Sequence, residues 1–136
     1  MGQIILSDEN CVGHAVAIFR DLKRLGYQEL LEVELRTFES SGLAEGLADK
    51  AVWQFCQENG YLLLTGNRTT KDGHRSLEFV IRHLVTPTTL PVLTIANMKR
   101  VIPDRQYCFD CANRLADIIA DLENYRGVTR LYLTRS

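Results

Sequence analysis

An uninterrupted apolar run, Tyr61-Leu62-Leu63-Leu64-Thr65, ends abruptly in Gly66-Asn67-Arg68. A short run without polar alternation is typical of a strand buried on both faces, as in a parallel sheet covered by helices. An earlier run, Ile4-Ile5-Leu6, ends in the same way, in Ser7-Asp8-Glu9-Asn10. The two runs predict an α/β fold in which polar side chains follow the carboxyl ends of buried strands.

Strand and helix patterns alternate along the whole chain. We predict strands at 3–7, 30–35, 61–65, 91–95 and 128–134. We predict helices at 12–25, ended by Gly26, at 49–59, begun by Asp49 and ended by Gly60, around 77–84, and at 107–124. This alternation indicates one domain over residues 1–136, a three-layer α/β/α sandwich around a five-stranded, mainly parallel sheet.

The composition is that of an ordinary globular domain. The chain has 136 residues, of which 46% are hydrophobic and 24% charged, which is enough for one proper core. No apolar run approaches the ~20 residues that cross a bilayer, and the amino terminus starts with a strand instead of a basic segment and a hydrophobic signal region. We therefore expect a cytoplasmic protein that does not span a membrane.

The net charge of −1 is unevenly distributed. Residues 1–65 carry 5 Lys/Arg against 10 Asp/Glu, whereas residues 66–105 carry 7 against 3. A basic rim beside acidic ligands suits a polyanion such as RNA, held through its phosphates, although solvated loop charges would give the same pattern. The basic excess follows predicted strand ends and consists of Arg68, Lys71 and Arg75, and then Lys99, Arg100 and Arg105.

Three of the four cysteines fall on apolar helical stripes. Cys108 and Cys111 form a C-x-x-C pair, but no second pair or H-x-x-x-H accompanies them to complete a zinc site. Cys56 likewise falls on an apolar helical stripe, with Val52 and Phe55. We expect these three to pack in the core as small hydrophobes. Cys11, next to the Asp8 strand end, is expected to be partly exposed, and a nucleophilic role for it would require His14 as a base.

The strongest candidates for a site are Asp8, Asp49 and Asn67. Asp8 and Asn67 follow strand ends and Asp49 opens a helix, so all three can meet at the carboxyl edge of the sheet, where ligands of such folds bind. For Asp8 and Asn67 to share a site the first and third strands must be neighbours, which with right-handed crossovers favours the order 2-1-3-4-5. Carboxylate and amide oxygens suit Mg²⁺ or Mn²⁺, with Glu9 and Glu78 as further candidate ligands; helix capping by Asp49 and a turn at Asn67 are the structural alternatives.

The same residues resemble the PIN-like domains, and most of all a short group of unknown function within that superfamily. The resemblance is carried by Leu6-Ser7-Asp8-Glu9-Asn10, by Asp49-Lys50-Ala51-Val52, which begins a helix, and by Leu64-Thr65-Gly66-Asn67, where the group has Thr-x-Asp. It covers roughly residues 3–100. Each motif is short, and their order and spacing make the match.

The resemblance implies a Rossmann-like sandwich and, in active relatives, Mg²⁺- or Mn²⁺-dependent RNA cleavage, often as the toxin of a toxin–antitoxin pair. It assigns Asp8, Asp49 and Asn67 to the catalytic and metal-binding positions. From the charge distribution, Arg68, Lys71 and Arg75 are the residues expected to bind RNA phosphates. This chain departs from the nuclease pattern at Asn67, where an amide replaces a carboxylate. An alternative is therefore a catalytically inactive PIN-like module that binds RNA or a protein.

A third hypothesis comes from a different class, a receiver-like regulatory domain. Such a domain needs an acidic pair after the first strand, which Asp8 and Glu9 supply, and a phosphoacceptor Asp at the end of the third strand, where this chain has Asn67.

We also predict a homodimer, because Trp53 lies off the Val52–Cys56 stripe and Tyr132 lies in the last strand, which would leave aromatic surface to bury. An antitoxin-like protein is the other expected partner.

Overall fold

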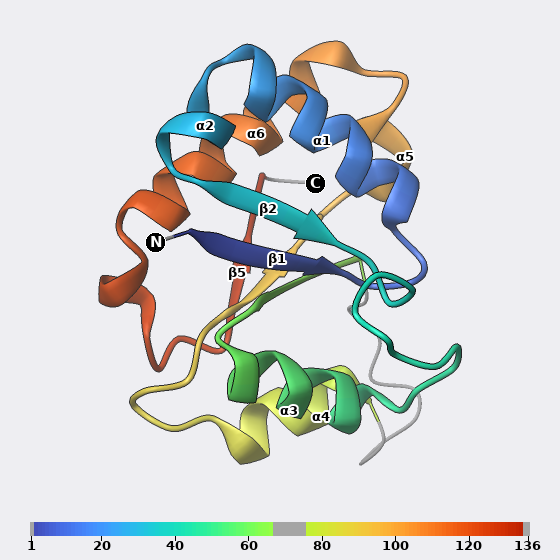
Figure 1. The fold of residues 1–136 in the computed structure, drawn as a ribbon, viewed down its shortest axis with the longest axis vertical. Helices are drawn as coiled ribbons and strands as arrows, with labels where there is room; N and C mark the ends of the chain where they lie inside the picture. The colour runs from blue at the N-terminus through green and yellow to red at the C-terminus, as the bar shows by residue number, and fades with distance from the viewer. Residues whose placement is uncertain (1, 67–75, 135–136) are drawn as a thin grey trace.

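The computed structural model describes residues 2–66 and 76–134. Five parallel strands form one sheet in the order β2-β1-β3-β4-β5, as predicted. Helices cover both faces of the sheet, so the fold is the predicted three-layer α/β/α sandwich (Figure 1). The strands are β1 (Gln3–Ser7), β2 (Val33–Arg36), β3 (Leu62–Thr65), β4 (Val92–Thr94) and β5 (Arg130–Tyr132).

The helices divide between the two faces. On one face lie α1 (Val12–Arg24), α2 (Tyr27–Leu30), α5 (Met98–Val101) and α6 (Arg105–Ala120), and on the other α3 (Asp49–Asn59) and α4 (Leu77–Leu84) (Figure 1). A 3-10 turn, η2 (Leu122–Tyr125), connects α6 to the last strand. Among the described residues, no helix combines the length and the apolar character that crossing a bilayer requires.

The apolar run of β3 is buried on both faces. Leu62 and Leu64 pack with α1 and α6, whereas Leu63 packs with α3 and α4. Alternate residues of a strand point to opposite faces, so only an unbroken apolar sequence can fill both cores. The run that dominates the sequence is therefore central, between β1 and β4.

Several element boundaries differ from the predictions. The second strand begins at Val33 because Tyr27–Leu30 forms a helical turn and Glu32 has a positive φ of 51°. The last long helix begins two residues early, since the Asp104 carboxylate caps it by accepting a hydrogen bond from the Tyr107 N–H at 3.1 Å. Helix α3 has the predicted bounds, but Ala48 is its N-cap and Asp49 its first residue.

Two expectations about individual side chains were wrong. Trp53 is only 5% exposed, because α4 packs beside α3 and encloses the ring in the apolar cluster that both helices share. Cys11 is 1% exposed instead of partly exposed. The prediction that Cys56, Cys108 and Cys111 pack in the core was confirmed, since all three are buried.

Candidate functional site

The carboxyl edge of the sheet carries polar oxygen atoms from neighbouring strands. Asp8 follows β1, Thr65 ends β3 and Thr94 ends β4. The Asp8 N–H donates to the Leu64 carbonyl at 2.8 Å, which continues the pairing of β1 and β3 to the point where Asp8 begins the loop. The helices that follow β1 and β3 in the sequence, α1 and α4, lie on opposite faces of the sheet, and ligands bind at such a switch point.

The Asp8 carboxylate is held in one orientation. Its Oδ2 accepts a hydrogen bond from the Thr65 hydroxyl at 2.8 Å, and its Oδ1 accepts one from the Glu9 N–H at 2.9 Å. Thr65 is fully buried, whereas Asp8 is half-buried. A carboxylate fixed by a buried neighbour and still reached by solvent is suited to bind a cation, because its lone pairs are not all occupied.

The Asp8 carboxylate lies on the α3 side of the sheet. Leu63 of β3 packs with α3 and α4, and Thr65, two residues further along the strand, points to the same face. Its hydroxyl, which donates to Asp8 Oδ2 at 2.8 Å, therefore holds the carboxylate on that side. Asp49 is the first residue of α3 and is half-buried. In Figure 1 the arrowheads of β1 and β2 and the amino-terminal end of α3 lie on the same side of the molecule, so Asp8 and Asp49 belong to one edge.

The other predicted site residues are distributed as follows. Asn67, Arg68, Lys71 and Arg75 lie outside the described residues, so their place relative to Asp8 stays a prediction. Within residues 2–66 and 76–134, no group of three or more His, Cys, Asp and Glu side chains is arranged to hold a metal ion. Asp8 and Asp49 are hard oxygen donors at the same edge, and this donor chemistry fits Mg²⁺ or Mn²⁺.

Glu9 fixes a loop. Both of its carboxylate oxygens accept from the Gly46 N–H, at 3.0 and 3.3 Å, which ties the segment between β2 and α3 to the end of β1. The same side chain lines a groove of about 490 Å³ beside that loop, together with Val12, Thr37, Phe38, Glu39, Leu43 and Glu45.

Glu78 forms an ion pair with a buried arginine that the sequence reasoning missed. Its Oε1 accepts from Arg130 at 3.0 and 3.2 Å, and its Oε2 accepts from Arg82 at 2.7 Å. Arg130 also donates to the Thr94 hydroxyl at 2.7 Å. Burial raises the pKa of the Glu78 carboxyl, but the hydrogen bond from Arg82 and the charge of Arg130 outweigh burial and hold that pKa below its usual range.

Cys11 is not placed as a nucleophile. Burial raises the pKa of its thiol to about 11, and its Sγ lies 3.4 Å from the Leu64 carbonyl oxygen and 3.6 Å from that of Asp8, close enough to donate to either. A buried thiol that stays protonated at neutral pH is unreactive. Cys11 instead packs beneath the ends of β1 and β3 and supports the loop that carries Asp8.

The basic residues Lys99, Arg100 and Arg105, which the sequence analysis placed after a strand end, lie in different environments. Arg100 pairs with Asp104 at 2.7 Å and lies over the Tyr107 ring, 4.5 Å from its centre. Arg105 lines a cavity between α1 and α6, on the opposite layer from α3. Lys99 is exposed on α5, which follows β4. Of this cluster, only Lys99 and Arg100 belong to the segment that leaves the sheet at the carboxyl edge.

Comparison of the chain with protein-family models, with curated proteins and with solved structures finds no match.

Proposed function

We propose that this protein is a PIN-like, Mg²⁺- or Mn²⁺-dependent endoribonuclease with a weakened acidic site. The observation that supports the proposal best is the Asp8 carboxylate at the switch point between β1 and β3, oriented by Thr65 at 2.8 Å and half-open to solvent. Sequence order adds Asp49 at the start of α3 and Asn67 just after β3. Phosphodiester cleavage by a divalent ion requires such a set of oxygen ligands.

Asp8, Asp49 and Asn67 are the residues proposed to hold the ion. When bound there, a divalent ion would neutralise phosphate oxygens and lower the pKa of the attacking water. Thr65 acts as a positioning residue, because its hydroxyl fixes one Asp8 oxygen and leaves the other oxygen's remaining lone pair available. Asn67 contributes an amide oxygen without charge, so ion affinity is expected to be lower than with three carboxylates.

The test combines Mn²⁺ titration by calorimetry with cleavage of a single-stranded RNA. Asp8→Asn is expected to abolish both ion binding and cleavage. Asn67→Asp is expected to raise Mn²⁺ affinity roughly tenfold and to increase cleavage, because one more charged ligand contributes about 1–3 kcal/mol. Asp117→Asn is the matched control, since Asp117 is exposed on α6, on the opposite layer.

Circular dichroism separates loss of function from loss of fold. Asp8→Asn keeps one oxygen that can accept a hydrogen bond, so we expect a folded variant. If Asp8→Asn binds Mn²⁺ as the control does and Asn67→Asp leaves affinity unchanged, the metal-dependent activity is refuted.

The proposed RNA-binding role of Arg68, Lys71 and Arg75 has its own measurement. Each phosphate contact to a single strand contributes about 0.7 to the slope of log K against log salt concentration. Replacing all three with Gln should therefore lower that slope by roughly 2. An unchanged slope would show that these residues are solvated loop charges.

A catalytically inactive module is the main alternative. It predicts binding of single-stranded RNA or of a partner protein with no cleavage in Mn²⁺, and no gain of cleavage in Asn67→Asp. A receiver-like regulatory domain is favoured by one further observation, because the order 2-1-3-4-5 is also that of such domains. Asn67 cannot accept a phosphoryl group, so the test is incubation of Asn67→Asp with acetyl phosphate and Mg²⁺. The receiver-like function predicts a phosphate adduct of this variant by mass spectrometry, formed with release of acetate.

A homodimer and an antitoxin-like partner remain part of the proposal. Of the two aromatic residues on which the dimer prediction rests, Trp53 is buried and Tyr132 is 45% exposed on β5. Light scattering at tens of micromolar is the test. A species of 15.5 kDa alone would refute the dimer.

A further inference from the structure

A cavity of about 340 Å³ opens between α1 and α6. Its volume falls within the range of small-molecule sites, roughly 300–1,000 Å³. The cavity belongs to the layer opposite α3 and α4, whereas Thr65 holds the Asp8 carboxylate on the side of α3 and α4, so the cavity is separate from the proposed metal site (Figure 1). Its lining residues are Asp21, Arg24 and Leu25 from α1 and its end, and Arg105, Gln106 and Phe109 from α6.

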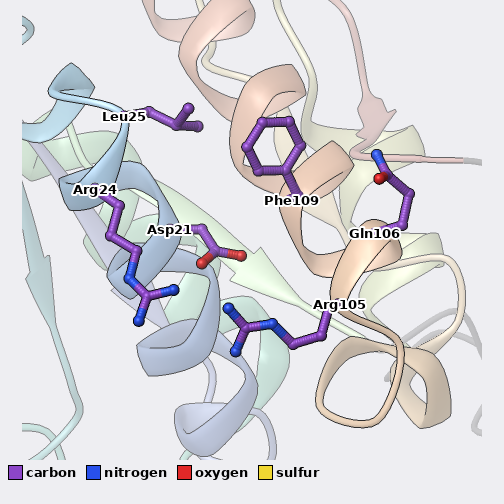
Figure 2. Close-up of a pocket in the computed structure, with 6 residues that line it drawn as sticks. All are labelled: Asp21, Arg24, Leu25, Arg105, Gln106 and Phe109. Atoms are coloured by element: carbon purple, nitrogen blue, oxygen red, sulfur yellow. The ribbon is translucent and has the colours of Figure 1, made fainter.

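Two guanidinium groups approach the cavity from different helices. Figure 2 shows Arg24 on α1 and Arg105 on α6, on either side of Asp21. In the described part of the chain neither arginine forms an ion pair, whereas Arg100 and Arg126 each pair with a carboxylate within 3.0 Å. Two guanidinium groups without an ion-pair partner among the described residues therefore line the same cavity.

Asp21 is the one acidic residue that lines the cavity, and its carboxylate forms a long ion pair with Arg20. Its side chain is almost completely buried, and its Oδ1 lies 3.9 Å from the Arg20 Nε. The carboxylate also lies beside the Cys108 thiol, whose pKa burial and this carboxylate raise to about 12. With one carboxylate against two guanidinium groups, the lining has a net positive charge, which favours an anion.

The rest of the lining is apolar and aromatic. Phe109 is 41% exposed although it is a large apolar side chain, and Leu25 is half-buried beside it. In Figure 2 these two side chains lie on one side of the view, the guanidinium groups of Arg24 and Arg105 on the other, and Asp21 between them. An exposed ring at the wall of a cavity offers a flat surface against which another ring stacks.

We propose that this cavity binds a small aromatic anion, a planar ring that carries one phosphate or carboxylate group. The anionic group accepts hydrogen bonds from the guanidinium groups of Arg24 and Arg105, whose planar forks match both oxyanions. The ring packs against Phe109 and Leu25, and the Asp21 carboxylate and the Gln106 amide are available to accept a hydrogen bond from a donor on the ring. This site is independent of the proposed nuclease activity.

The test is calorimetric titration of the full chain with three probes: phenyl phosphate, benzoate and inorganic phosphate. Phenyl phosphate or benzoate should bind at least tenfold more tightly than inorganic phosphate, because only the first two bury a ring. The comparison of phenyl phosphate with benzoate identifies which oxyanion the arginines prefer. If no probe binds at millimolar concentration, or if all three bind equally, the proposal is wrong.

Variants assign the binding to this cavity. Arg24→Gln and Arg105→Gln should each weaken binding of the preferred probe about tenfold, since each removes a charge-assisted hydrogen bond. Arg114→Gln is the matched control, because Arg114 lies on the same helix, over the Tyr125 ring and outside the cavity. Phe109→Ala should remove the advantage of the ring compounds and leave the affinity for inorganic phosphate unchanged. Equal affinities in Arg24→Gln, Arg105→Gln and Arg114→Gln would overturn the proposal.

Discussion

Replacement of Glu78 with Gln tests whether this residue is structural or belongs to the metal site. The Arg130 side chain is 6% exposed and receives its charge compensation from Glu78 Oε1, at 3.0 and 3.2 Å, while the Thr94 hydroxyl accepts a third hydrogen bond at 2.7 Å. Glu78→Gln keeps the shape of the side chain and an oxygen acceptor, but it removes the negative charge that faces a buried guanidinium.

The magnitude follows from the burial of the pair. Breaking a fully buried ion pair costs about 3–5 kcal/mol, because the remaining charge stays desolvated. Glu78 is 20% exposed and the amide oxygen still accepts one hydrogen bond, so we expect the free energy of unfolding to fall by about 2–3 kcal/mol. For a domain of this size that corresponds to a decrease in Tm of roughly 6–12 °C.

The assay is urea unfolding at neutral and acidic pH. Arg82→Gln is the control, because Arg82 binds the same carboxylate but is 69% exposed, so its loss should cost only about 0.3–0.5 kcal/mol. The Glu78 pKa is lowered in the folded state, so its contribution is complete above the unfolded pKa, about 4.3, and disappears as pH falls through the folded pKa. The difference between wild type and Glu78→Gln should therefore shrink in acid.

Two results would refute this reasoning. Equal unfolding free energies for Glu78→Gln and Arg82→Gln would show that the Arg130 pair contributes no more than a surface pair. A loss of Mn²⁺ affinity in Glu78→Gln, with stability unchanged, would return Glu78 to the metal site.

Three further predictions concern the core and the backbone. Cys11, like the other buried thiols, should not react with a thiol reagent at pH 8 in the native protein, whereas all four cysteines should react in denaturant, as counted by absorbance. Leu64→Ala should lower the free energy of unfolding by about 3–4 kcal/mol in urea titration, because Leu64 is fully buried in the central strand. Gly127→Ala should lower the free energy of unfolding by about 1–2 kcal/mol in the same assay, since Gly127 has a φ of +86° and an added Cβ would lie 3.3 Å from the Pro87 Cα. Gly13→Ala is the comparison: Gly13 lies in a helix with open space around it, so this substitution should raise the free energy of unfolding slightly.

Much of the architecture was predictable because it depends on local pattern. The unbroken apolar run of β3 can fill two cores only in a covered parallel sheet, and the strand order β2-β1-β3-β4-β5 was confirmed. Helix α3 has the predicted bounds because Gly60 ends it in the left-handed conformation, with a φ of 70°. The position of Asp8 at the carboxyl edge follows from the strand that precedes it.

Side-chain environments were less predictable, because they depend on which elements pack together. Trp53 is off the helical stripe that faces the sheet, yet the neighbouring α4 buries it. Arg130 pairs with Glu78, which is 52 residues away in the sequence, and the Asp8 carboxylate accepts a hydrogen bond from Thr65, which is 57 residues away. The sequence signal for the first pair was an arginine within the predicted last strand, and its burial became evident only in the structure.

The sequence by itself determined the class of fold, the order of the elements and the position of Asp8 at the carboxyl edge of the sheet, since these follow from hydrophobic periodicity and from the geometry of parallel strands. Tertiary structure alone decided that Cys11 is buried, that Glu78 belongs to Arg130, and that Arg24 and Arg105 share a cavity with Phe109. The physical reason is that burial, charge compensation and cavity shape depend on which two elements pack together. The hydrophobic periodicity of one element does not specify the element that packs against it.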